Sequence, residues 1–242
     1  MLFIGPVVYA QEASLRLEQA NTLYRGGDFK NAVVAYEDIL KNGYEHPALY
    51  YNLGNAYFKL GNIPAAITNY ERAKRLSPRD EDINQNLRLA NLRVVDKIEP
   101  LPQLFIQDWW DALLSLFASD GWAVFGIISI WIAVIAGVLF MLLRSGVLQR
   151  ILFVIILISL IVTILSTVGV VQQRHREYNE QQAIVFSPSI SIKSAPDAQS
   201  MDLFVLHEGV KVELLDHVGE WRKIRLADGK VGWLQSECVE II

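Results

Sequence analysis

The chain has 242 residues, of which 52% are hydrophobic, and a formal net charge of −4. This length allows two small domains in addition to membrane-spanning segments, and no strongly basic region indicates a nucleic-acid partner. Cys238 is the single cysteine, which excludes an internal disulfide, and we expect it to be a small buried residue of a strand.

Residues 1–10, MLFIGPVVYA, resemble the end of a secretory signal peptide. An apolar stretch is followed by the helix-disfavouring Gly5 and Pro6, and the small residues Val8 and Ala10 occupy the −3 and −1 positions of a cleavage site. We expect cleavage after Ala10. A basic segment before the apolar stretch is missing, so the alternatives are a start further upstream, an uncleaved short anchor, or an N-terminus without a role.

Residues 11–99 are predicted to form an all-α domain of repeated helix pairs. A shift of 34 positions pairs Gly27 with Gly61 and Tyr36 with Tyr70. Short helix pairs cannot bury their apolar faces alone, but stacked copies can. The two glycines are expected to end the first helix of each pair in a left-handed conformation.

The second copy resembles the tetratricopeptide repeat, whose signature positions are occupied here by Tyr50, Leu53, Gly54, Tyr57, Ala66, Tyr70, Ala73 and Pro78. The resemblance implies that the first helices line a concave groove that binds a peptide or partner protein. The groove residues would be Asn21, Arg25, Asn52, Asn55, Lys59 and Asn86. Asparagine amides can bind both the N–H and the C=O groups of an extended peptide. The alternative is that these residues form solvated helix faces.

The first helix of a third repeat is expected from Glu81 to about Val95. It should cap the array with a polar face. Members of the family that bind C-terminal carboxylates keep basic residues at positions that Leu17, Asp82 and Asn86 occupy here. Capture of a C-terminal carboxylate is therefore not expected.

Residues 100–121 are predicted to form an interfacial linker helix. Pro100 and Pro102 make a stiff break before it, and Trp109 and Trp110 lie among aspartates. Tryptophan rings favour the lipid headgroup layer because they combine an apolar body with one N–H donor. The alternative is an ordinary helix packed on the first domain.

Residues 122–171 are predicted to form a transmembrane hairpin. The runs Trp122–Leu143 and Ile151–Val171 contain no charged residue. Each has about 20 residues, which matches a hydrocarbon core of roughly 30 Å. A chain that crosses twice returns to its starting side, so both terminal domains are expected in one compartment. Without ionisable residues in either span, a pore or transporter is not expected.

The connecting loop carries Arg144 and Arg150, which favours a cytoplasmic loop because cytoplasmic loops are enriched in Lys and Arg. Arg174 and Arg176 after the second span argue weakly for the opposite orientation. The signal-like N-terminus favours the orientation with the loop in the cytoplasm. We therefore expect a two-span protein of the bacterial inner (cytoplasmic) membrane with both terminal domains in the periplasm.

Residues 183–242 are predicted to form an all-β small barrel of about five short strands. Ile190 and Ile192 alternate with polar neighbours, a pattern that is typical of strands. Asp228 and Gly229 separate two such runs and predict a type I′ turn, in which both central residues have positive φ.

The order of strands and turns resembles the bacterial SH3 family. The resemblance is carried by IKSAP at residues 192–196, GEW at 219–221 and VGWL at 231–234. It implies a non-catalytic targeting module, since some members bind cell-wall peptides. Trp221 and Trp233 are the candidates for a ligand platform. The alternative is that both tryptophans pack in the core and rim of the barrel.

No enzymatic activity, metal or cofactor is expected. The four histidines His46, His175, His207 and His217 lack the spacing of metal ligands, and the sequence has no nucleophile elbow or phosphate-binding loop.

The complete layout resembles the BatE family of aerotolerance operons, on the domain order and the patterns AxxYNLGNAYFKLG and GxWxKI. The resemblance implies an envelope complex with von Willebrand factor A membrane proteins and a MoxR-type ATPase. The sequence thus predicts a non-enzymatic membrane scaffold that binds envelope partner proteins through the repeat groove. The alternative is a cell-wall sensor or anchor that binds peptidoglycan through the SH3-like domain.

Overall fold

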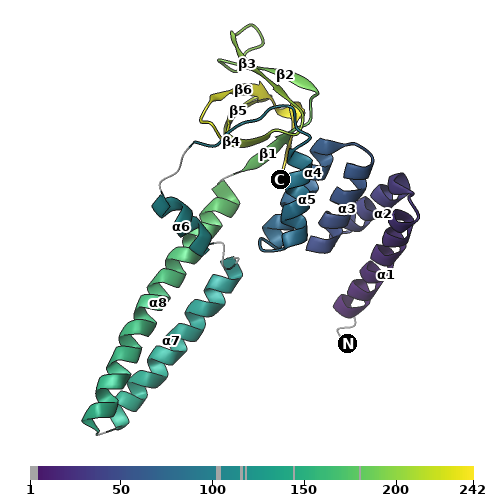
Figure 1. Ribbon diagram of the computed structural model, residues 1–242. Helices are drawn as coiled ribbons and strands as arrows, with labels where there is room; N and C mark the ends of the chain where they lie inside the picture. The colour runs from purple at the N-terminus through teal and green to yellow at the C-terminus, as the bar shows by residue number, and fades with distance from the viewer. Residues whose placement is uncertain (1–4, 102–104, 115–116, 118, 144, 180) are drawn as a thin grey trace. The chain divides into compact units, whose positions relative to one another are not determined.

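The computed structural model describes residues 5–101, 105–114, 117, 119–143, 145–179 and 181–242. The chain divides into two compact units (Figure 1). One unit combines Met1–Pro102 with Gln181–Ile242, and the other is Gln103–Glu180. The predicted fold class is confirmed, because the chain contains an all-α array, two long apolar helices and a C-terminal antiparallel β-sheet.

Five helices form the array: α1 (Gly5–Arg25), α2 (Phe29–Lys41), α3 (Pro47–Lys59), α4 (Ile63–Leu76) and α5 (Glu81–Asn91). The side chains of Asp28 and Asn62 cap α2 and α4 by accepting the backbone N–H three residues further on, at 3.3 and 3.2 Å. Gly27 and Gly61 have φ values of 81° and 79°, which confirms the left-handed helix ends.

Two helix boundaries differ from the expectation. Gly5 and Pro6 lie in the first turn of α1, where proline is tolerated because its missing N–H would have no intrahelical partner. Helix α5 ends at Asn91, before the expected Val95, and Leu92 forms its C-cap. Residues 1–4 of the signal-like segment lie outside the described residues, and cleavage after Ala10 remains a prediction.

Small residues allow the helices of the array to approach closely. A Cβ atom at Gly54 would lie 2.7 Å from the ring of Tyr70, which is fully buried. Since close-packed interiors leave no room for such a contact, glycine is required between α3 and α4 at this point.

The C-terminal region forms one antiparallel sheet in the order β3-β2-β6-β5-β4-β1-β7. The strands are β1 (Gln182–Val185), β2 (Ser189–Lys193), β3 (Asp202–His207), β4 (Lys211–Val218), β5 (Trp221–Arg225), β6 (Val231–Gln235) and β7 (Val239–Ile241). The sheet has more strands than the expected five because β1 and β7 pair beside β4. Cys238 lies in the short 3₁₀ helix Ser236–Cys238 and is half-buried, so the prediction of a buried strand position was wrong.

The turn between β5 and β6 also differs from the prediction. Gly229 has a φ of +87°, but no other residue type has positive φ within the described part of the chain, so the turn is not type I′. The Gly229 N–H donates to the Leu226 carbonyl at 2.9 Å, and Leu226 N–H donates to the Lys230 carbonyl at 2.9 Å. These bonds are those of a type I turn followed by a left-handed glycine.

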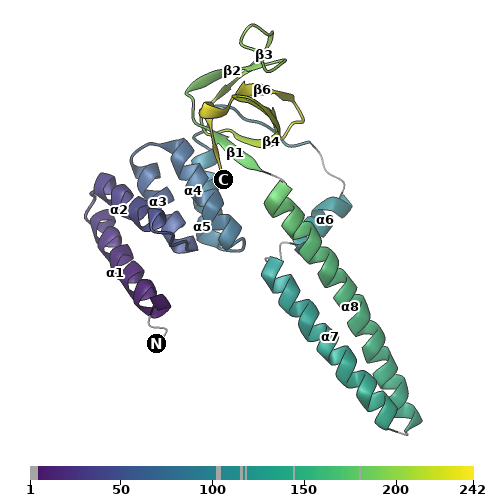
Figure 2. The same ribbon diagram turned by 180° about the vertical axis from the view of Figure 1, so that it is seen from behind.

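The helical array and the sheet share one hydrophobic core. Strand β1 runs along α4 (Figure 2), and its residues Ala183, Ile184 and Val185 are all fully buried. A strand that is buried on consecutive positions is covered on both faces. The same core contains Ile67 of α4 and Val94. The two terminal modules therefore form one folded unit, and the sequence had given no indication of this seam.

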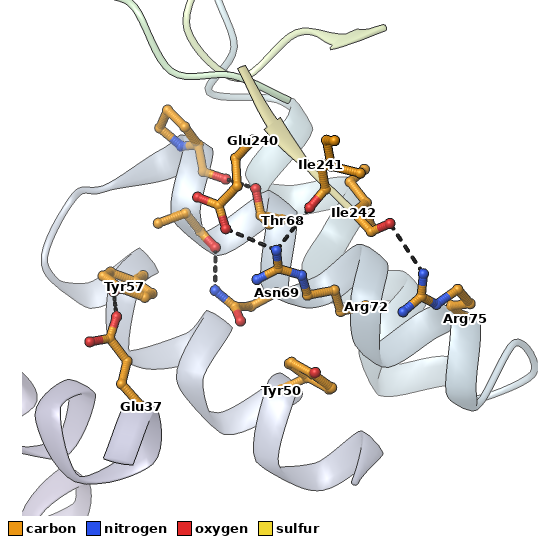
Figure 3. Close-up of polar contacts among 12 residues, drawn as sticks. Glu37, Tyr50, Tyr57, Thr68, Asn69, Arg72, Arg75, Glu240, Ile241 and Ile242 are labelled. Atoms are coloured by element: carbon orange, nitrogen blue, oxygen red, sulfur yellow. Dashed lines mark hydrogen bonds and ion pairs between the residues drawn. The ribbon is translucent and has the colours of Figure 1, made fainter. Parts of the chain in front are cut away.

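Polar contacts reinforce this seam (Figure 3). The Arg72 guanidinium on α4 donates to the Glu240 carboxylate and to the Ile241 carbonyl, both at 2.9 Å. Arg75, one helical turn later, donates to the Ile242 carbonyl at 3.1 Å. Two further pairs join the modules, Lys211 with Glu71 at 2.9 Å and the His207 backbone N–H with Asp96 at 2.7 Å.

The second unit contains α6 (Phe105–Leu114), α7 (Ser119–Leu142) and α8 (Gly146–Asn179). The segments Asp120–Leu142 and Gly146–Gln172 have 23 and 27 residues and are apolar enough to span a membrane. At 1.5 Å per residue they measure about 35 and 40 Å, more than a hydrocarbon core of about 30 Å.

Helices α7 and α8 pack against each other as the predicted hairpin. The buried Ser129 hydroxyl donates to the Ser159 carbonyl at 2.8 Å, and a Cβ atom at Gly126 would lie 3.2 Å from Ser166. Small residues of this kind let apolar helices approach closely. Trp110 of α6 donates to the Gln172 side chain at 2.8 Å, but the interfacial position of α6 remains a prediction. Pro102 and Arg144 lie outside the described residues.

Candidate functional site

The predicted groove residues lie on alternate helices of the array. They come from α1, α3 and α5, the first helices of the successive repeats. Four asparagines are half-buried, and the two basic residues are exposed: Asn21, Asn52, Asn55 and Asn86, with Arg25 and Lys59.

The asparagines are hydrogen-bonded to one another across the repeats. The Oδ1 atom of Asn21 accepts from the Tyr36 hydroxyl at 2.8 Å and from Asn52 Nδ2 at 2.9 Å. This arrangement joins α1, α2 and α3. The Asn21 oxygen therefore already accepts two hydrogen bonds, and these bonds connect three helices of the array.

The next repeat contains the same arrangement 34 residues later. The Oδ1 atom of Asn55 accepts from the Tyr70 hydroxyl at 2.7 Å and from Asn86 Nδ2 at 2.8 Å. Asn86 Nδ2 also donates to the Tyr51 hydroxyl at 2.9 Å. The two sets of bonds form a polar ladder that fixes the spacing of α1, α3 and α5.

Burial keeps the ladder tyrosines protonated. Desolvation raises the pKa of Tyr36 to about 12 and raises the pKa of Tyr70 as well. A raised pKa means that the neutral phenol is favoured in the folded state. Both hydroxyls therefore stay available as donors to the asparagine oxygens at neutral pH.

The basic groove residues differ in their partners. Arg25 donates to the Glu18 carboxylate at 2.5 Å and to the Thr22 hydroxyl at 3.2 Å, and its guanidinium lowers the pKa of the Glu18 carboxyl. Lys59 forms no ion pair with any described residue. Its ammonium group is available to an external anion.

A pocket of about 340 Å³ lies in the groove between the repeats. Its lining combines four aromatic side chains and one leucine with two asparagines and one lysine. The lining residues are Tyr24, Tyr51, Asn55, Phe58, Lys59, Tyr70, Asn86 and Leu89. Pockets with apolar walls and a few fixed polar groups are suited to binding a side chain of a partner.

The two predicted platform tryptophans lie on one face of the sheet. Trp221 of β5 is in register with Gln235 of β6, and Lys223 is in register with Trp233, so the tryptophans are diagonal neighbours. Both rings are half-buried. The Lys223 ammonium lies 5.9 Å from the centre of the Trp233 ring. This face combines aromatic surface with positive charge, and its role as a ligand platform remains a prediction.

The described residues include no group of three or more His, Cys, Asp and Glu side chains that could hold a metal ion. His207, the histidine nearest the seam, has its Nδ1 atom 3.1 Å from Asp96 Oδ1 and so belongs to the contact between the modules.

Several groove residues were missed in the sequence. Tyr36 and Tyr70 were recognised as repeat positions but not as the hydrogen-bond partners of Asn21 and Asn55, which share the same 34-residue spacing. The pocket walls Tyr24, Phe58 and Leu89 were also missed. The spacing of Tyr24 and Phe58, again 34 residues, was the signal that could have identified two of them.

Comparison with known families supports both modules. Residues 17–81 match the tetratricopeptide repeat model, and residues 188–240 match the bacterial SH3 domain model. Tetratricopeptide repeat protein 16 of Homo sapiens and of Macaca fascicularis are each 35% identical over 66 residues. This match covers 27% of the chain but only 8% of either relative, so the similarity concerns the repeats.

Proposed function

We propose that the protein is a non-enzymatic, membrane-anchored adaptor that holds a partner protein in the groove of its helical array. The observation that carries this proposal is the pocket of about 340 Å³ lined by aromatic residues of successive repeats. The ladder bonds between repeats fix its walls in place, so the partner meets a preformed surface. Both matched families are typically interaction domains.

Membrane anchoring is supported by the two long apolar helices and by the shared core. Residues before and after the hairpin fold together, so both ends of the hairpin must emerge on the same side of any membrane that it crosses. Two crossings satisfy this requirement. The signal-like N-terminus and the loop arginines support our placing the protein in the inner membrane with its folded unit on the periplasmic side.

The resemblance to the BatE family suggests the setting of this adaptor. In that setting the partners are envelope proteins, including von Willebrand factor A membrane proteins, and the complex acts in aerotolerance. Retention of the partner at the membrane is the function that we propose for this adaptor.

Replacing Leu89 by aspartate tests the adaptor function. Leu89 forms part of the pocket wall with 46% of its surface exposed, so a charge there leaves the fold intact while it opposes an apolar partner side chain. We expect Leu89→Asp to reduce the recovery of partner proteins from crosslinked native membranes about tenfold, as for a central interface residue.

Val34→Asp is the matched control because Val34 is 64% exposed on α2, outside the pocket lining. Equal recovery with Leu89→Asp and with Val34→Asp would refute groove binding. The alternative role is that of a cell-wall anchor, and it is favoured by the position of Trp221 and Trp233 on the same face of the sheet. Cosedimentation of the same full-length preparations with peptidoglycan tests this role. Retention that Trp233→Ala abolishes would support that alternative.

A further inference from the structure

The basic residues of the groove follow the repeat. Arg25, Lys59 and Arg93 are each separated by 34 residues, and they lie at or just beyond the C-terminal ends of α1, α3 and α5. All three are exposed. We call this set the cation row.

Two members of the cation row lie at the pocket, Lys59 as a lining residue and Arg93 through its contact with Phe58. Arg25 follows the lining residue Tyr24 at the end of α1, the position that Lys59 takes after Phe58 at the end of α3. The Arg93 guanidinium lies 6.0 Å from the centre of the Phe58 ring. A ligand that fills the pocket would therefore meet Lys59 and Arg93 at its edge.

The spacing of the row is set by the helices that carry it. Asn52 bonds to Asn21 and Asn86 bonds to Asn55, so α1, α3 and α5 are direct neighbours. Packed helices lie about 8–10 Å apart. A polyproline II segment rises about 3.1 Å per residue with three residues per turn, so every third side chain returns to the same edge after about 9 Å. An extended β-strand does not match, since its side chains return after two residues or about 6.6 Å.

We propose that the groove recognises an acidic polyproline II segment of a partner protein, with carboxylates at every third position facing the cation row and an intervening proline or aliphatic side chain in the pocket. This inference rests on the adaptor function proposed above and specifies the partner. The segment is internal to the partner, and it needs no free C-terminus.

The groups that face this segment are compatible with negative charge. Lys59 and Arg93 form no ion pair with any residue that the structure describes. Arg25 pairs with Glu18, but both side chains are 62% exposed, and a partner carboxylate can replace so exposed a pair at little cost.

The other explanation for basic residues at helix ends is stabilisation of the helix dipole. Lys41 provides the matched control because it is exposed in the last turn of α2, which is a second helix of a repeat and does not line the pocket. Its charge interacts with the dipole of α2 in the same way as the charges of the cation row interact with their helices. Lys41 itself does not belong to the cation row.

Fluorescence anisotropy with the full-length protein in detergent tests the inference. The probe is a labelled peptide that repeats Glu-Pro-Ala four times, and its isomer has the same composition with the glutamates consecutive. We expect the repeating peptide to bind about fivefold more tightly than the isomer. Lys59→Gln and Arg93→Gln should each weaken binding about threefold, whereas Lys41→Gln should leave it unchanged.

Equal binding of the two peptides, or equal weakening by Lys41→Gln, would overturn the inference, because either result indicates unpatterned charge attraction. Recovery of the partner from crosslinked native membranes distinguishes this outcome from failure of the adaptor function. If Leu89→Asp loses the partner but the Lys59→Gln, Arg93→Gln double variant keeps it, the adaptor function stands and the acidic segment is wrong. If neither variant loses the partner, the adaptor function itself fails.

Discussion

Replacing Gly209 by alanine is expected to lower the free energy of unfolding by about 2–4 kcal/mol, from overpacking and a left-handed backbone. Gly209 lies at the seam between the helical array and the sheet with a φ of +87°. An added Cβ atom would lie 2.8 Å from Val94 Cγ2 and 3.5 Å from Ile67 Cδ1. Urea titration of the full-length protein in detergent measures the change.

Gly219→Ala is the control for the backbone contribution. Gly219 also has positive φ, +59°, but an added Cβ atom would have no other heavy atom within 4 Å. Its replacement should cost about 1 kcal/mol, the left-handed backbone contribution alone. The difference between the two variants measures the packing of the seam. Equal losses would show that Gly209 does not touch the helices in solution.

Replacing Ile67 by aspartate is expected to unfold both modules together. Ile67 is 1% exposed on α4 and belongs to the core that includes β1. An unpaired charge at such a position costs about 3–5 kcal/mol, which is a large share of the stability of a small domain. Hydrogen exchange should show lost protection in α4 and also in β4 and β5, which lie far away in the sequence.

Leu89→Asp introduces the same charge on a half-exposed groove residue and should leave the exchange pattern unchanged. If Ile67→Asp instead destabilised the helices while the strands kept full protection, the SH3-like domain would be an independent module. The shared core would then not exist in solution.

The elements of the fold could be predicted because their signals are local. The 34-residue spacing, the left-handed Gly27 and Gly61, and two uncharged runs each lie within a short stretch of sequence. The seam could not be predicted, because its contacts join residues more than a hundred positions apart, such as Asp96 and His207. An apolar position such as Ile67 has the same appearance in sequence whether a helix or a sheet covers it.

The candidate site was predicted only in part. The first-helix positions were identified from the repeat, but the hydrogen-bond partners of the asparagines depend on side-chain packing. Asn21 and Asn55 are candidates for capturing a peptide by their chemistry, yet their oxygens already accept bonds from Tyr36 and Tyr70. We therefore expect a partner to contact the pocket lining and the cation row rather than the oxygens of these two asparagines.

Photocrosslinking in native membranes tests the central claim, that the groove holds a partner protein, most directly. A photoreactive residue at Leu89 in the pocket wall, or at Val34 on α2 as the control, is activated and the adducts are identified by mass spectrometry. We predict protein adducts from Leu89 that map to an acidic, proline-containing segment and are absent from Val34. Adducts no more frequent at Leu89 than at Val34 would contradict the account.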